Sequence, residues 1–251
     1  MRRSASAAIL AVILGVPAAA AAQGGPGFLF RQPRLTIGVR AGYVVPKGGG
    51  QLFDYALDEF IESGADTLSS MNFNGPYLGG ELAYRPTDRW DVVASLGWTR
   101  SRTLTEYRRW VDSSDNPIEQ ETTFQVVTGT VGVKYYFEDR GRRVGSLAWV
   151  PHRLAPYVSA GVGLSGYEFT QEGDLLDLST LEISYDQLHS RRVGFAGYGS
   201  AGADLTLAKH VLLTGEARYS LAKAGVNGSY RDFDSIDLGG MHFLLGLGFQ
   251  F

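Results

Sequence analysis

The chain has 251 residues, no cysteine and a formal net charge of −3 at pH 7. The absence of cysteine excludes disulfides and thiolate metal sites. The mild acidity argues against a nucleic-acid partner, which requires a basic surface. Glycine (33 residues) and aromatic residues (12%) are abundant, and beyond the N-terminal region no run of about 18 apolar residues predicts a membrane-spanning helix.

The first 22 residues have the pattern of a secretory signal peptide. Arg2 and Arg3 give a positive start, residues 7–16 form an apolar run, and the alanines at 20–22 form a small-residue cleavage site before Gln23. The apolar run is too short to cross a bilayer. We predict that 1–22 is a signal peptide removed on export and that 23–33 is a short periplasmic leader.

In the remaining chain, apolar residues recur at every second position in several segments, which is the pattern of β-strands. We predict eight strands, at 34–45, 77–85, 90–100, 124–137, 154–169, 193–205, 211–219 and 241–251. The last strand places Met241, Phe243, Leu245, Leu247, Phe249 and Phe251 on one face.

Long and short connections alternate between these segments. Residues 86–89 and 208–210 are tight turns, whereas 46–75, the polar segment 101–121, the acidic segment 171–190 and 222–236 are predicted long loops. The long connection 138–153 lies on the short-turn side and does not fit this alternation. In the first long loop, apolar residues at helical spacing predict one helix that folds back onto the barrel mouth, with Leu52, Phe53, Ala56, Leu57, Phe60 and Ile61 on its apolar face.

An even number of such strands, with long loops on one side, is typical of an outer-membrane barrel. We therefore predict that 34–251 forms an eight-stranded antiparallel transmembrane β-barrel. Because a closed barrel leaves no unpaired backbone in lipid, the last strand should pair with the first. Outward aromatic residues should form one girdle at each interface, Tyr84, Trp90, Phe137 and Phe251 at the short-turn ends and Tyr43, Trp98, Phe195 and Tyr219 near the long loops. The alternative, a soluble lipocalin-like barrel, would turn these apolar faces inward.

Three motifs carry a resemblance to a known family: Pro156-Tyr-Val-Ser-Ala-Gly-Val-Gly-Leu164, Ala201-Gly-Ala-Asp-Leu-Thr206 and the terminal Phe249-Gln-Phe251. With them the chain resembles the outer-membrane barrels that include the OmpA transmembrane domain and OmpX, and more distantly OmpW. The resemblance implies that Phe251, Phe249 and Leu247 form the signal that the barrel-assembly machinery recognises. We expect no peptidoglycan-binding domain after Phe251. The implied partners are outer-membrane lipid and lipopolysaccharide, and we expect a monomer.

The predicted lumen carries four cationic and four anionic side chains, Arg40, Arg85, Lys134, Arg218, Glu81, Asp91, Asp204 and Glu216. Arg40, Glu81, Glu216 and Arg218 fall at similar depth. A charge-selective pore would show an excess of one sign. We therefore predict that Arg40, Glu81, Lys134, Glu216 and Arg218 form a charge network that fills the lumen.

The sequence offers no convincing catalytic constellation. An outer-membrane enzyme acting on lipid A would need a histidine and a serine together on the outer face near the extracellular rim. His189 and Ser190 are adjacent, so they face opposite sides of a strand, His242 has no serine two positions away, and His152 and His210 lie in short-turn regions. We expect no enzyme activity, no metal site and no cofactor.

Three functions remain open. The first is a non-enzymatic outer-membrane protein that serves envelope integrity or surface interaction. The second is an OmpW-like conduit for small hydrophobic compounds, which the predicted helix, Phe124 and Leu244 favour. The third is a lipid A-modifying enzyme, which the histidine positions disfavour. Candidate surface contacts lie in the second and fourth long loops, at Tyr107, Arg108, Arg109, Trp110, Tyr230, Arg231 and Phe233.

Overall fold

The computed structural model describes residues 27–63, 68–146, 148–176 and 180–251. The predicted signal peptide and the first residues of the leader lie outside these ranges. None of the helices in the described ranges is long and apolar enough to cross a membrane.

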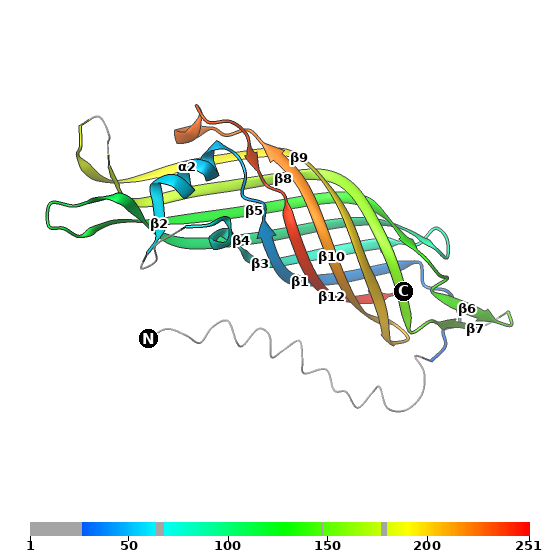
Figure 1. Cartoon of the computed structure of the whole chain (residues 1–251). Helices are drawn as coiled ribbons and strands as arrows, with labels where there is room; N and C mark the ends of the chain where they lie inside the picture. Colours follow the sequence, from blue (N-terminus) through cyan, green and yellow to red (C-terminus); the bar gives the residue numbers. More distant parts are fainter. Residues whose placement is uncertain (1–26, 64–67, 147, 177–179) are drawn as a thin grey trace.

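Eight antiparallel strands form a closed ring, which confirms the predicted barrel (Figure 1). The first and last strands pair from Thr36↔Gln250 to Pro46↔Gly240, as ring closure requires. Strands β9 and β10 pair with each other, so the ring has no free edge at membrane depth. The ring strands are β1 (Leu35–Pro46), β3 (Gly75–Tyr84), β4 (Trp90–Val111), β5 (Pro117–Tyr136), β8 (Leu154–Leu176), β9 (Ile183–Ala208), β10 (Val211–Ala224) and β12 (Gly240–Gln250).

The outer surface of the ring is apolar and its interior is polar. Val39, Val162 and Phe195 are 66%, 72% and 84% exposed, whereas the inward Arg40 and Lys134 are 4% and 3% exposed. A soluble barrel would bury the first three side chains and expose the charges. Apolar side chains therefore point outward and polar ones inward, as in a barrel that faces lipid. The alternative of a soluble, lipocalin-like barrel is wrong.

We call the apolar outer surface of the ring, which includes Val39, Val162 and Phe195, the belt. Two pairs of strands continue well past this apolar belt. The β4–β5 ladder extends to Glu106↔Glu119, and the β8–β9 ladder extends to Leu176↔Ile183. Since β5 also pairs with β8 up to Gln120↔Gly173, the four strands form one sheet that projects from the barrel (Figure 1). The predicted loops at 101–121 and 171–190 are thus wrong. Their sequences are polar because both faces of these strand extensions lie outside the bilayer, so no apolar alternation marks them.

At the opposite end, the connection 138–153 forms a hairpin of its own. Strands β6 (Gly141–Val144) and β7 (Ala148–Pro151) pair outside the ring. The leader joins this hairpin, because Leu29 and Trp149 exchange two backbone hydrogen bonds of 2.8 Å. This end of the barrel therefore carries a small, structured extension where the sequence predicted none.

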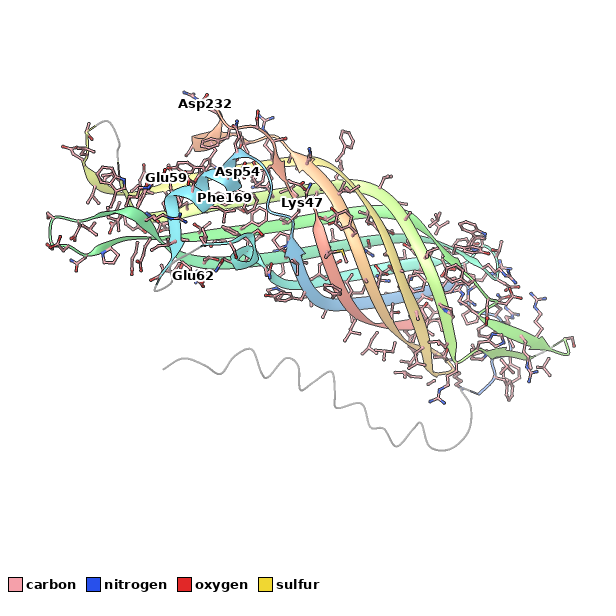
Figure 2. The ribbon with its side chains drawn as sticks, viewed as in Figure 1. Lys47, Asp54, Glu59, Glu62, Phe169 and Asp232 are labelled. Carbon is pink, nitrogen blue, oxygen red and sulfur yellow. The ribbon has the colours of Figure 1, made fainter. Side chains whose placement is uncertain are left out.

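A helix is present in the predicted segment and closes the long-loop end of the barrel, but it ends at Glu59, so Phe60 and Ile61, predicted on its apolar face, belong to the strand that follows. Helix α2 (Gln51–Glu59) buries Leu52, Phe53 and Ala56, and strand β2 (Phe60–Glu62) then pairs with β4. Phe53 packs edge-to-face against Phe73 and Phe124, at ring-centroid distances of 5.1 and 5.6 Å. We call this apolar cluster the plug. It includes Leu52, Phe53, Ala56, Phe60, Phe73, Tyr107, Ile118, Phe124, Phe169, Tyr230 and Ile236. Figure 2 labels Phe169 at this end of the barrel.

Three short elements complete the long-loop end. They are the 3-10 turns η2 (Ser70–Phe73) and η3 (Gly228–Tyr230), and strand β11 (Ile236–Asp237), which pairs with β10. Lys47 forms a 2.9 Å ion pair with Asp237 and so joins the start of the first loop to β11. The first and fourth long loops are therefore packed together over the mouth.

Inward tyrosines and facing glycines fill the barrel interior. A Cβ at Gly132 would lie 2.7 Å from the Tyr198 hydroxyl, and one at Gly161 would lie 2.5 Å from the Tyr198 ring. Since Cβ atoms do not approach other atoms this closely, only glycine leaves room for the ring. The same relation holds between Tyr77 and Gly97. The glycines in the strands thus make space for large side chains in a narrow lumen.

Candidate functional site

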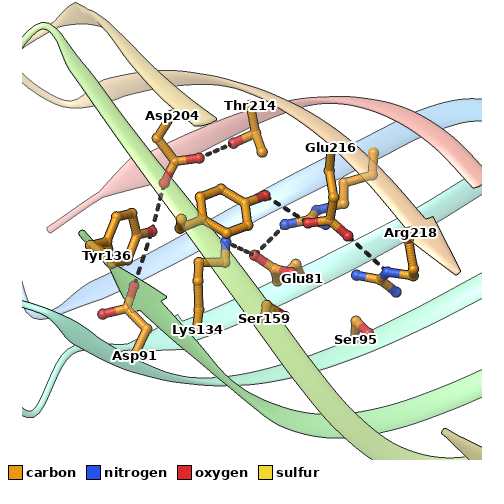
Figure 3. A network of polar contacts seen from close by, with 12 residues as sticks. Glu81, Asp91, Ser95, Lys134, Tyr136, Ser159, Asp204, Thr214, Glu216 and Arg218 are labelled. Atoms are coloured by element: carbon orange, nitrogen blue, oxygen red, sulfur yellow. Dashed lines mark hydrogen bonds and ion pairs between the residues drawn. The ribbon is translucent and has the colours of Figure 1, made fainter. Parts of the chain in front are cut away.

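The five predicted lumen residues form one connected ion-pair network (Figure 3). Arg40 bridges two strands, with Nη2 2.6 Å from Glu81 Oε1 and Nη1 2.7 Å from Glu216 Oε2. Lys134 Nζ lies 3.0 Å from the same Glu81 oxygen, and Arg218 Nε lies 2.8 Å from Glu216 Oε1. The network therefore joins β1, β3, β5 and β10 across the lumen.

Tyrosines complete the coordination of these charges. The Tyr157 hydroxyl donates a 2.6 Å hydrogen bond to Glu216 Oε2. The Lys134 ammonium lies 4.3 Å from the centroid of the Tyr157 ring, and the Arg218 guanidinium lies 4.2 Å from that of Tyr198. Each cation thus has a carboxylate and either a second carboxylate or a ring face, which is the condition under which buried charges are tolerated.

A second charged cluster lies nearer the short-turn end, and its central cation was not predicted. Arg140 forms a bidentate pair with Asp91, at 2.5 and 2.8 Å. The Tyr136 hydroxyl donates to Asp204 Oδ2 at 2.6 Å, and the Arg140 guanidinium lies 4.0 Å from the Tyr136 ring centroid. Arg140 immediately precedes β6, in the connection 138–153, which has no recognisable sequence pattern. Only its position in space identifies it as a lumen residue.

Arg140 changes the charge balance of the lumen. Among the described residues, the lumen now holds five cationic and four anionic side chains, since Arg140 joins the four predicted of each sign, and Arg85 is the one cation of the five that forms no ion pair. The excess of one positive charge is small compared with the number of ion pairs in the lumen. The arrangement is therefore that of a largely neutralised interior rather than a pore lined by one sign of charge.

Little empty space remains inside the barrel. A cavity of about 20 Å³ lies among the ion pairs. A second, of about 40 Å³, lies between the network and the plug and is lined by Tyr77, Phe124, Tyr198, Arg218 and His242, among others. Spaces of this size hold one to a few waters. The lumen is thus blocked twice, by the charge network and by the plug.

A histidine–serine pair lines the cavity between the network and the plug, and the sequence spacing did not reveal it because the serine comes from another strand. His242 Nε2 lies 2.8 Å from the hydroxyl of Ser220, which reaches it from the neighbouring strand β10. His242 Nδ1 has no hydrogen-bond partner among the described residues, so no third group orients the ring as catalytic triads require. The pair lines the lumen and not the outer face, where a lipid A-modifying enzyme would need it.

The predicted interface aromatics all lie on the outer surface. Tyr84, Trp90, Phe137, Tyr43, Trp98 and Tyr219 are between 40% and 52% exposed. The register places Tyr84 opposite Leu35, near the short-turn end, and Tyr43 opposite Phe243, near the long-loop end. Phe249 and Phe251 are also exposed and pack edge-to-face, with ring centroids 5.0 Å apart. Their role in assembly, with that of Leu247, stays a prediction.

The candidate surface residues in the long loops separate into two groups. Tyr107 and Tyr230 are buried in the plug, and Phe233 packs against it. Trp110 is exposed at the tip of the β4–β5 hairpin, and Arg109 and Arg231 face solvent. Arg108 donates a 3.0 Å hydrogen bond to the carbonyl of Leu57 and so holds the end of α2. Trp110, Arg109, Arg231 and the exposed part of Arg108 are therefore the candidates that a partner can reach from solvent.

No family model and no curated protein sequence matches the chain. Among solved structures it is similar to the outer membrane protein OprG of Pseudomonas aeruginosa, with 16% identity, 89% of this chain and 99% of that chain covered, and a TM-score of 0.48. Neisserial surface protein A is 14% identical, with 91% and 100% covered and a TM-score of 0.46. The attachment invasion locus protein Ail of Yersinia pestis is 14% identical, with 88% and 100% covered and a TM-score of 0.44.

Because each of these TM-scores lies below 0.5, the fold assignment depends on the closed ring and the apolar exterior. The predicted strand number, ring closure and side-chain parity are all present. The chain is an eight-stranded β-barrel that resembles the outer-membrane barrels of the OmpA, OmpX and OmpW kind.

Proposed function

We propose that the chain is a non-enzymatic integral outer-membrane protein with a closed lumen, which presents a structured sheet on the cell surface. The predicted signal peptide at 1–22 would direct export, and the long-loop end would face outside. Outer-membrane lipid and lipopolysaccharide would surround the belt, and the barrel-assembly machinery would insert the chain as a monomer.

One observation carries this proposal: the lumen is closed by two independent layers. Arg40, Glu81 and Glu216 meet across its centre at 2.6–2.7 Å. Above them, Phe53 at 1% exposure and Phe169 at 2% belong to the plug that covers the mouth. A solute would have to break buried ion pairs and displace an apolar cluster, and both steps are costly.

The test is conductance in planar lipid bilayers. The purified, refolded chain should give little or no ion current, and its migration in gels should change on heating, as expected of a folded barrel. A variant with both layers weakened, Phe53→Ala with Glu216→Ala, is the positive control and should show more frequent openings. Large ohmic channels from the unaltered chain would contradict the proposal.

The projecting sheet supports a role in surface interaction. Its outward face carries a row of carboxylates, in which Glu106 lies opposite Glu119 and Glu121 lies opposite Glu172. Arg102 pairs with Glu121, and Tyr185 donates a 2.5 Å hydrogen bond to Glu172. Like charges placed opposite each other weaken a sheet, so the row is not there for stability. An acidic face of this kind favours cationic partners.

A conduit for small hydrophobic compounds is the second candidate, which the apolar plug favours. It requires a cavity for its cargo, and the space beneath the plug is about 40 Å³, whereas ligand sites measure about 300–1,000 Å³. Uptake of a small alkane into liposomes that contain the chain would separate the two candidates. Uptake above that of empty liposomes would favour the conduit.

A further inference from the structure

We propose that the short-turn end of the barrel holds the phosphate headgroup of an anionic phospholipid, in a groove between the leader and the β6–β7 hairpin. The groove has a volume of about 600 Å³ and is lined by Arg31, Arg34 and Arg143 together with Phe30, Trp149 and Phe251. None of these residues belongs to the lumen network or to the plug. The groove is within the size range of small-molecule sites.

The three arginines come from two segments that the fold brings together. Arg31 and Arg34 belong to the segment that enters β1, and Arg143 belongs to β6. The Leu29–Trp149 backbone bridge fixes the leader against the hairpin. Arg143 Nη2 also donates a 3.5 Å hydrogen bond to Gln32 Oε1. The arginines are therefore held on both sides of one groove by ordered backbone.

The groove has three cationic side chains and one carboxylate in its wall, the terminal carboxyl group of Phe251, which accepts a 2.7 Å hydrogen bond from the backbone N–H of Arg34. Within the described ranges, Arg31, Arg34 and Arg143 form no ion pair. Of the nearby acids, Asp139 pairs with Arg89 at 2.8 Å, whereas Asp88 accepts a hydrogen bond from the neutral Gln32 and keeps its charge, so the three arginines still outnumber the unpaired carboxylates. Guanidinium groups bind phosphate with two parallel hydrogen bonds. Three exposed arginines around a groove therefore select an anion.

The aromatic residues decide which anion fits. Phe30 is 78% exposed and Phe251 is 55% exposed, and Phe28, at 54%, packs edge-to-face on Phe30. Phe251 also follows directly on β12, at the short-turn end of the apolar belt. A soluble acidic peptide or free phosphate would leave these rings in water, whereas a phospholipid places its headgroup at the arginines and its acyl chains against the rings. In the proposed orientation this end faces the phospholipid leaflet of the outer membrane.

The experiment is a lipid titration of the refolded full-length chain in nonionic detergent, followed by native mass spectrometry. The probes are short-chain phosphatidylglycerol and phosphatidylcholine with the same acyl chains. The groove variant is R31Q/R34Q/R143Q, and the matched control is R100Q/R109Q/R231Q, which removes three exposed arginines at the other end. We expect phosphatidylglycerol to bind the unaltered chain and the control alike, and the groove variant at least about tenfold more weakly.

Equal binding of phosphatidylglycerol by the groove variant and the control would overturn the proposal, as would equal binding of the two lipids by the unaltered chain. Glycerol phosphate or a hexaglutamate peptide that binds as tightly as the lipid would also overturn it, and would assign the groove to a free phosphate or to an acidic peptide. If the triple variant does not show heat-modifiable migration, F30S tests the aromatic half, and the same loss of lipid binding is expected.

This inference rests on the proposed outer-membrane orientation, and the two can fail separately. The titration measures lipid selectivity with purified protein, whereas labelling of intact cells at a cysteine introduced beside Trp110 tests which end faces outside. If intact cells are labelled beside Trp110 but the purified protein does not prefer the anionic lipid, only the proposal of the lipid groove is overturned. If the purified protein prefers the anionic lipid but intact cells are not labelled, the proposed orientation is overturned and the anionic-lipid site is retained.

Discussion

Arg40 of β1 and Glu216 of β10 form a 2.7 Å ion pair although a third strand, β12, lies between their own. The residue of β12 opposite Arg40 is Gly246. A Cβ at Gly246 would lie 3.1 Å from Arg40 Cγ, closer than most such contacts. The pair thus forms because β12 has no side chain at that height.

Removal of one partner from this pair should strongly destabilise the barrel. Glu216→Gln leaves Arg40 and Arg218 without their shared carboxylate, and loss of one member of a buried pair costs about 3–5 kcal/mol. Urea unfolding of the refolded chain in detergent, followed by gel migration, measures the change. The control is Asp139→Asn, which breaks the exposed Arg89–Asp139 pair and should cost at most about 1 kcal/mol. Similar losses in both variants would refute a structural role for the lumen network.

A side chain at Gly246 should disturb the network without removal of a charge. Gly246→Val would push on Arg40, and we expect about 1–3 kcal/mol of destabilisation, as for other overpacked interiors. Gly199, which has open space around the Cβ position, provides the control as Gly199→Val. If the two variants were equally stable in urea, the bridging role of Gly246 would be wrong.

A charged side chain should destabilise the lipid-facing belt but have little effect in the projecting sheet. Leu245 is 58% exposed in the belt and Leu104 is 44% exposed on the outward face of the sheet. Leu245→Arg should cost about 2–4 kcal/mol, as measured near the midplane of other barrels, whereas Leu104→Arg should change stability by less than about 0.5 kcal/mol. Folding yield into lipid vesicles compares the two, and equal yields would contradict the position of the belt.

The plug should open when its central ring is removed. Phe53 is 1% exposed and contacts Phe73 and Phe124, so Phe53→Ala should cost the plug about 3–5 kcal/mol. Hydrogen exchange in Gln51–Glu59 should accelerate while exchange in β1 and β12 stays slow. Accelerated exchange throughout the barrel would show that the plug and the ring unfold together.

The terminal aromatic should matter for assembly more than an equivalent aromatic elsewhere on the same rim. We expect deletion of Phe251 to lower the amount of folded protein in the outer membrane several-fold. Phe137→Ala, which removes a ring of similar exposure (52% against 55%), should leave the amount near normal. Cell fractionation with heat-modifiable gel migration makes the comparison, and normal levels after the deletion would remove Phe251 from the assembly signal.

The sequence by itself determined the existence of the eight strands, which side chains of each strand point outward, and all of the lumen charges named above except Arg140. Lipid imposes an apolar residue at every second position of each membrane-crossing strand, so the parity that places Val39 outside also places Arg40 inside. The helix at 51–59 was also predictable, because its apolar spacing reflects burial against the barrel mouth. These features depend on local pattern.

Only the tertiary structure decided the remainder. The strand extensions at 101–111 and 170–176 carry no apolar alternation, because neither face contacts lipid; pairing with neighbouring strands and a few plug contacts, such as those of Tyr107 and Leu176, sustain them. Arg140, the Ser220–His242 pair and the arginine groove join residues from separate segments, and their chemistry depends on register between strands. The register between strands follows from closure of the ring. Because closure is a property of the whole chain, the register cannot be predicted from the sequence of any single segment.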